Sequence, residues 1–149
     1  MAFLLGSWRG RGSGLYPTIE PFEYEEELEF ADVGKPYLTY RQRTWRHVDR
    51  ERLPSHMELG FWRPQPDGGL EVVSAHANGV IEIEIGTVAD DRIELVSRTV
   101  ASAPTAKDVS RVERTFEIAG DVLTYEVRMA AVGQPIGPHL HAQLTRRSS

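Results

Sequence analysis

Apolar and polar residues alternate along most of the chain, which is the pattern of β-strands with one face inward and one outward. From Phe22 to Phe30 apolar residues alternate with four glutamates, and these glutamates are expected to form a solvated face. From Val80 to Gly86 three isoleucines alternate with two glutamates, so the isoleucines are predicted to face the core and the glutamates the water. No long amphipathic helix pattern competes, so the chain is predicted to be all-β.

Ten strand-like segments follow one another, and residues that favour turns separate them. Asn78-Gly79 and Gly120-Asp121 are two such turns. The predicted strands are a first one beginning at Gly6 and further ones at 22–30, 36–47, 56–64, 70–77, 80–86, 91–102, 109–118, 121–132 and 138–146.

Ten short sequential strands joined by tight turns favour an antiparallel up-and-down arrangement. An open sheet of this size would leave two long edges exposed to aggregation, and closure removes both. We therefore predict a ten-stranded antiparallel barrel of the kind seen in lipocalins and fatty-acid-binding proteins. Because side chains can just fill a barrel of about eight strands, a wider barrel is expected to enclose a cavity.

Four glycines surround one tryptophan in the first predicted strand. In an extended conformation Gly6, Trp8, Gly10, Gly12 and Gly14 share one face, so that face carries a single side chain. Something bulky must lie against the bare backbone. Two explanations stay open: the strand bends within a barrel whose floor the tryptophan closes, or the missing side chains make room for a ligand.

Composition narrows the classes of function. The 149 residues suffice for a single domain, 1–149, and the net charge of −5 disfavours nucleic acid as a partner. The absence of cysteine excludes disulfides, thiolate nucleophiles and cysteine-ligated metals, and it is compatible with the predicted cytoplasmic location. No run of 18 apolar residues occurs, so we expect a soluble protein without a membrane partner.

The histidines are the main candidates for metal ligation or acid-base chemistry. His139 and His141 are two positions apart, which would place both imidazoles on one strand face, where His76 or Glu58 could complete a zinc site. His56 and His76 share strand faces with residues expected to point into the barrel. For each of them a hydrogen-bonded core histidine is the more common explanation.

Several segments, in order along nearly the whole chain, resemble the nitrobindin family. The first is Gly6-Ser-Trp-Arg-Gly-Arg-Gly12, which is similar to the Gly-x-Trp-x-Gly-x-Gly signature of that family. The others are Tyr16-Pro-Thr-Ile19, Gly34-Lys-Pro36, Gly60-Phe-Trp-Arg-Pro64, Val127-Arg-Met-Ala130 and Pro138-His-Leu-His141. The resemblance implies a ten-stranded barrel that holds one b-type haem per chain.

The same resemblance implies roles for individual residues. A histidine of the last strand, here His139, would be the proximal iron ligand, and Thr18 and Lys107 would lie beside the haem. His56 and His76 match positions that line the cavity in the family. Met129 is expected to form a wall of the pocket, because it continues the inward face of its strand.

The last predicted strand presents a conflict. Leu140, Ala142 and Leu144 form its apolar face, and strict alternation would then put His139 on the outer face. A β-bulge near Gly137-Pro138, or a haem seated at the barrel mouth, would reconcile this pattern with an iron-binding role.

The resemblance implies that the protein isomerises peroxynitrite to nitrate at a five-coordinate ferric haem and also binds nitric oxide. Two alternatives use the same barrel: a non-catalytic carrier of a small apolar ligand, and a nitric oxide sensor or store. Lipocalin-like carriers also begin with a Gly-x-Trp strand, so the opening motif does not separate these functions. The expected partners are small molecules, and a homodimer is possible.

Overall fold

The computed structural model describes residues 1–148 and consists almost entirely of strands. One short 3-10 helix, η1 (Ala2–Leu4), precedes them. The strands are β1 (Gly6–Tyr16), β2 (Ile19–Asp32), β3 (Leu38–Val48), β4 (Glu51–Pro64), β5 (Gly69–His76), β6 (Val80–Ala89), β7 (Arg92–Ser102), β8 (Val109–Ala119), β9 (Val122–Ala131) and β10 (Gly137–Arg146). The prediction of ten strands is confirmed.

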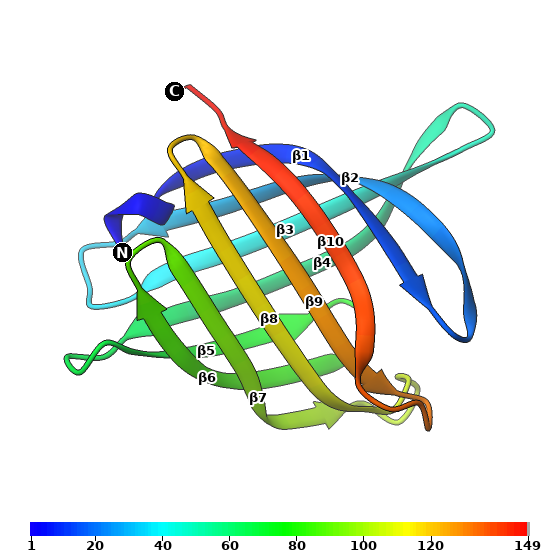
Figure 1. Ribbon diagram of the computed structural model, residues 1–149. Coiled ribbons are helices and arrows are strands. Elements are labelled where there is room, and N and C mark those ends of the chain that lie inside the picture. The colour runs from blue at the N-terminus through cyan, green and yellow to red at the C-terminus, as the bar shows by residue number, and fades with distance from the viewer. Residues whose placement is uncertain (149) are drawn as a thin grey trace.

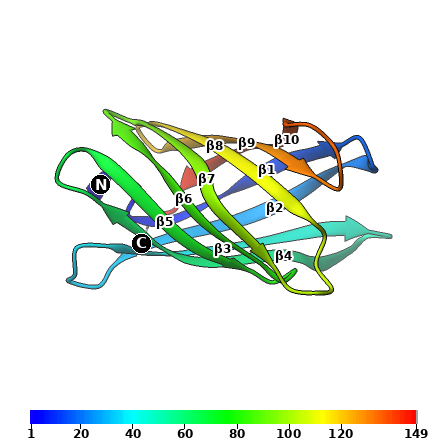
Figure 2. The same ribbon diagram turned by 90° about the horizontal axis from the view of Figure 1, so that it is seen from below.

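All neighbouring strands are antiparallel, and β1 pairs with both β2 and β10, so the sheet closes into a barrel without edges (Figures 1 and 2). In such a barrel successive turns alternate between the two ends. The start of β1, the end of β10 and the β2–β3, β4–β5, β6–β7 and β8–β9 turns lie at one end, which we call the floor. The other five hairpin connections lie at the opposite end, which we call the mouth.

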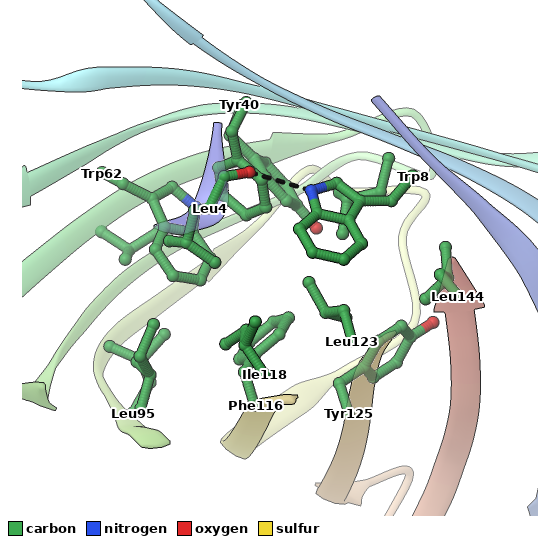
Figure 3. Packing of buried hydrophobic residues seen from close by; sticks show 14 of the residues in the cluster. Leu4, Trp8, Tyr40, Trp62, Leu95, Phe116, Ile118, Leu123, Tyr125 and Leu144 are labelled. Atoms are coloured by element: carbon green, nitrogen blue, oxygen red, sulfur yellow. Dashed lines mark hydrogen bonds between the residues drawn. The ribbon is translucent and has the colours of Figure 1, made fainter. Parts of the chain in front are cut away.

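Trp8 closes the floor, as one of the two explanations of the glycine strand requires. Its side chain is fully buried, and its indole Nε1–H donates to the Leu4 carbonyl oxygen at 2.8 Å (Figure 3). The guanidinium of Arg146 lies 4.0 Å from the centre of the indole ring and donates to the Phe3 carbonyl oxygen. The last strand thereby fixes the N-terminal turn over the barrel floor.

The bare face of the glycine strand is covered by the chain itself. A Cβ added to Gly12 would lie 2.3 Å from the ring of Tyr24, and one added to Gly14 would lie 2.2 Å from the ring of Phe22. At Gly10 the same addition would come within 2.0 Å of the Gln143 carbonyl oxygen. The glycines therefore allow close approach of two aromatic rings and of the neighbouring backbone.

The predicted orientation of β6 is wrong. Ile81 and Ile83 are 56% and 42% exposed on the outer surface, whereas Glu82 and Glu84 are buried inside the barrel. The physical reason is a cation on the facing wall: Arg114 of β8 binds both carboxylates, and these ion pairs offset the cost of burying them. Period-two alternation located the strand correctly but could not show which face was inward.

β10 carries the β-bulge that an inward His139 requires. Pro138 pairs with Arg128 and Leu140 pairs with Val127, so His139 is the extra residue between two consecutive partners of β9. As a result His139 and Leu140 both line the cavity, while His141 is exposed on the outside. The prediction that His139 and His141 share one strand face is therefore wrong.

Side chains fill the barrel unevenly. Large apolar residues, including Trp62, Phe116 and Leu123, pack tightly above the floor (Figure 3). Polar and charged side chains occupy the middle, and the mouth is hollow. No helix within residues 1–148 is long and apolar enough to cross a membrane.

Candidate functional site

A cavity of about 390 Å³ opens at the mouth of the barrel. Its upper wall is mostly apolar and includes Phe22, Val127, Met129 and Leu140. Its deeper wall is polar and is formed by Gln42, Thr44, His56, Glu58, His76, Glu82, Arg114 and Tyr125. The predicted cavity is thus present, and it combines an apolar rim with an ionisable interior.

The bulge of β10 presents the His139 imidazole to this cavity. Nδ1 lies 3.0 Å from the Leu15 carbonyl oxygen. A carbonyl oxygen only accepts, so Nδ1 must carry the proton, and the lone pair of the imidazole is on Nε2. Burial lowers the pKa of His139, which favours this neutral tautomer. Metal-bound histidines typically have this arrangement, with one nitrogen donating to a carbonyl and the other free to ligate.

Tyr16 supports His139 from the side. The two rings meet edge to face with centroids 5.5 Å apart. The Tyr16 hydroxyl accepts from the Ala131 amide at 2.8 Å and lies within 3.3 Å of the Met129 and Ala131 carbonyl oxygens. β1 and β9 thereby fix the orientation of the imidazole through one buried tyrosine.

The structure brings together most of the predicted site residues. His56, His76, Lys107, Met129 and His139 all line the cavity. Lys107 belongs to the β7–β8 loop at the mouth and is exposed. Thr18, in contrast, lies in the exposed β1–β2 turn and is not part of the cavity lining.

A buried cation with three carboxylates forms the deepest part of the site. Arg114 donates to Glu82 at 2.9 Å, to Glu84 at 3.0 Å and to both oxygens of Glu58 at 3.3 Å. The guanidinium of Arg114 holds the pKa of Glu58 well below its ordinary range, although burial alone would raise it. Burial raises the pKa of Glu84 to about 7, against the lowering effect of Arg114.

A second buried carboxyl, Glu26 of β2, has no cation as a direct partner among the described residues. Gln42 donates to its Oε1 at 2.6 Å, and the Tyr125 hydroxyl donates to its Oε2 at 2.7 Å. The Tyr24 hydroxyl is 2.7 Å from that of Tyr125 and continues the chain of hydrogen bonds. Burial raises the pKa of Glu26 to about 7, because these two donors replace only part of the lost hydration.

Sequence reasoning missed Arg114, Glu26 and Tyr16 as members of the site. One signal was available: Arg114 stands between Val112 and Phe116 on an otherwise apolar inward face, and Glu26 stands between Tyr24 and Leu28 in the same way. A charged side chain among residues that face the barrel interior requires a buried partner of opposite charge or a hydrogen-bond partner. Tyr16 was part of a recognised motif, but nothing in the sequence indicated its contact with His139.

Comparisons with known proteins identify the family of the chain. A model of the family described as THAP4-like, heme-binding beta-barrel domain matches residues 1–146. A relative from Mycobacterium tuberculosis named peroxynitrite isomerase 1 is 51% identical, and the match covers 97% of this chain and 91% of the relative. A relative from Mycobacterium marinum named peroxynitrite isomerase 2 is 47% identical, with 99% of this chain and 93% of the relative covered.

Two solved structures share the barrel fold of this chain. The crystal structure of Rv2717c from Mycobacterium tuberculosis superposes with a TM-score of 0.90 at 49% identity, covering 99% of this chain and 94% of that one. An S-type phycobiliprotein lyase, CPES from Guillardia theta, shares the fold with a TM-score of 0.69 at 11% identity, covering 99% and 90% of the two chains. The resemblance found in the sequence is confirmed: the chain belongs to the family of THAP4-like, heme-binding β-barrel domains.

Proposed function

We propose that the protein is a haem-dependent peroxynitrite isomerase, which binds one b-type haem in the barrel cavity through Nε2 of His139. The observation that carries the proposal is the hydrogen bond from His139 Nδ1 to the Leu15 carbonyl oxygen. It leaves a neutral imidazole with its lone pair on the other nitrogen, at the wall of a cavity large enough to admit an apolar ligand.

The residues around His139 fit a haem. Phe22, Val127, Met129 and Leu140 offer apolar surface for the faces of a porphyrin. Lys107 places a cation at the exposed mouth, where the carboxylates of a haem would remain hydrated. The chain has no cysteine, and His139 would hold the iron of the haem.

His139 would hold the iron of a bound ferric haem, which would supply the Lewis acid for converting peroxynitrite to nitrate and for binding nitric oxide. The chain contributes orientation and shielding. Tyr16 and Leu15 fix the imidazole plane, and the apolar upper wall limits the access of water. No general base is required, because the isomerisation leaves the atom count and the charge of the anion unchanged.

The polar interior argues against the carrier alternative. A small apolar ligand that filled the cavity would lie against the polar and charged side chains of its deeper wall and could not replace their lost hydration. A nitric oxide sensor or store would use the same haem, and catalysis distinguishes it from an isomerase. Thr18 as a haem neighbour, a homodimer and a cytoplasmic location stay predictions.

The test is the decay of peroxynitrite in a stopped-flow experiment with the haem-loaded protein, free haemin and His139→Ala treated with haemin. We expect the wild type to accelerate decay well above free haemin, with nitrate as the product, and His139→Ala to lose this gain. The matched control is His141→Ala, an exposed histidine two positions away, which should behave as the wild type.

Each rival predicts a different outcome. If the protein takes up haemin but accelerates the decay of peroxynitrite no more than free haemin does, it would be a nitric oxide sensor or store. A protein that takes up no haemin would favour the carrier. If haemin-treated His139→Ala accelerates the decay of peroxynitrite as much as the wild type does, the assignment of His139 as the iron ligand is refuted.

A further inference from the structure

Three potential ligand atoms meet at the inner wall of the cavity. His56 Nε2 and His76 Nδ1 are 3.2 Å apart, and Glu58 Oε1 lies 3.5 Å from the first and 3.3 Å from the second. His56 and Glu58 are two positions apart on β4, and His76 is the register partner of Glu58 on β5. Strand pairing therefore holds all three side chains on one inward surface.

The spacing matches a tetrahedral metal ion. With bonds of about 2.0–2.1 Å to nitrogen and oxygen, the ligands of a tetrahedral zinc ion are about 3.3–3.4 Å apart. The observed separations of 3.2, 3.3 and 3.5 Å form such a triangular face. We propose that His56, Glu58 and His76 form a binding site for a divalent transition metal ion such as Zn²⁺, separate from the haem ligand His139.

Outer contacts orient these ligands in the way metal sites require. His76 Nε2 lies 3.5 Å from Glu82 Oε1, so this carboxylate can hold the proton there and leave Nδ1 free to bind. Tyr40 donates to Glu58 Oε2 at 3.2 Å, while Glu58 Oε1 faces the histidines and also accepts from Arg114 at 3.3 Å. All three ligands line the cavity, so the fourth coordination position faces its open space.

The charge of the surroundings also favours a cation. Glu58, Glu82 and Glu84 share the single guanidinium of Arg114, so the buried cluster holds more carboxylates than cations. A divalent ion at the proposed site would neutralise the surplus.

This inference is independent of the haem, so its test uses the full chain before haem is added. Co²⁺ serves as the probe, because four-coordinate Co²⁺ has intense visible absorption. We expect one Co²⁺ per chain with a tetrahedral spectrum, displaced by Zn²⁺. Glu82→Gln removes an outer partner of His76 and should weaken Co²⁺ binding by about 10–100-fold. His56→Ala removes a ligand and should weaken Co²⁺ binding by more than that.

Two controls make the result decisive. His141→Ala removes an exposed histidine, and His139→Ala removes the proposed haem ligand; both should retain the Co²⁺ spectrum. Since the His56 side chain is 30% exposed, His56→Ala is expected to fold, which far-UV circular dichroism checks.

Three results would overturn the metal site: no tetrahedral Co²⁺ spectrum in the wild type, an unchanged spectrum in His56→Ala, or a spectrum lost in His139→Ala. The last would place the ion at His139 instead. Because haem uptake is measured separately, failure of the metal site leaves the haem assignment untouched, and the reverse also holds.

Discussion

Replacing Glu26 by glutamine should stabilise the protein at alkaline pH. Glu26 is completely buried, and its two hydrogen-bond donors are neutral. Burial raises its pKa from the ordinary value of 4.5 to about 7, so the native state keeps the proton that the unfolded chain has already lost. The contribution of Glu26 to stability is therefore greatest below about pH 4.5 and is lost as the pH rises through about 7.

The magnitude follows from that difference. At 1.36 kcal/mol for each pKa unit, a rise from 4.5 to about 7 costs about 3 kcal/mol of unfolding free energy once both states are ionised. Glutamine resembles the protonated carboxyl and does not incur this cost. We expect Glu26→Gln to gain up to about 3 kcal/mol over the wild type at pH 8, and little at pH 4.

Gln42 can adapt to the new side chain. Its Oε1 is buried without a hydrogen-bond partner among the described residues, while its Nε2 donates to Glu26. A rotation of the Gln42 amide would turn Oε1 toward the introduced amide group, which can donate. The Tyr125 hydroxyl would keep the oxygen of the new side chain as its acceptor.

Urea denaturation of the haem-free protein at a series of pH values measures this effect. Glu23→Gln is the matched control, because Glu23 lies on the outer face of the same strand and is exposed; it should follow the wild type within about 0.5 kcal/mol. Glu84 also titrates near pH 7, so the difference between variant and wild type isolates Glu26. Parallel pH curves for Glu26→Gln and the wild type would refute the reasoning.

Four further substitutions test the packing of the barrel by the free energy of unfolding. Arg114→Met leaves three buried carboxylates without their cation and should cost about 3–5 kcal/mol at pH 8, but less at pH 5, where the carboxyls take up protons. Gly10→Ala should cost at least about 1–3 kcal/mol, because its Cβ would overlap the Gln143 carbonyl oxygen; a neutral effect would contradict the close approach. Ile81→Ala on the outer surface should change stability by only about 0.5 kcal/mol, whereas Leu95→Ala in the core should cost about 2–5 kcal/mol; the reverse order would contradict the orientation of β6.

The fold was predictable because its signal repeats along the chain. Ten alternating segments with turn residues between them define the number and order of strands, and closure follows from the cost of open edges. The sequence also indicated closure of the floor by Trp8 as one of two explanations of the glycine strand, and the structure shows Trp8 fully buried there. Each of these conclusions depends on local pattern alone.

Orientation was harder to predict, because it depends on partners far away in the sequence. Glu82 and Glu84 point inward because Arg114, on another strand, meets them there. Alternation gives the same pattern for either orientation, and hydrophobicity favoured the wrong one. The inward face of β6 could be assigned only together with that of β8.

The site was predictable in part. The sequence suggested both His139 and the need for a bulge, and the structure shows that bulge. The triangle of His56, Glu58 and His76 depends on the register between β4 and β5, which the sequence does not specify. The sequence pattern indicates instead a zinc site at His139 and His141, with His76 or Glu58 as the third ligand. A one-residue irregularity in β10 was enough to separate His139 from that neighbour.

Titration with haemin, followed by visible absorption, tests most directly whether His139 holds a haem in the barrel. The wild type should develop a sharp Soret band that saturates at one haemin per chain. His139→Gly should lose this spectrum and regain it when imidazole is added to replace the missing side chain. Uptake of haemin by His139→Gly with the wild-type spectrum and no imidazole would contradict the assignment.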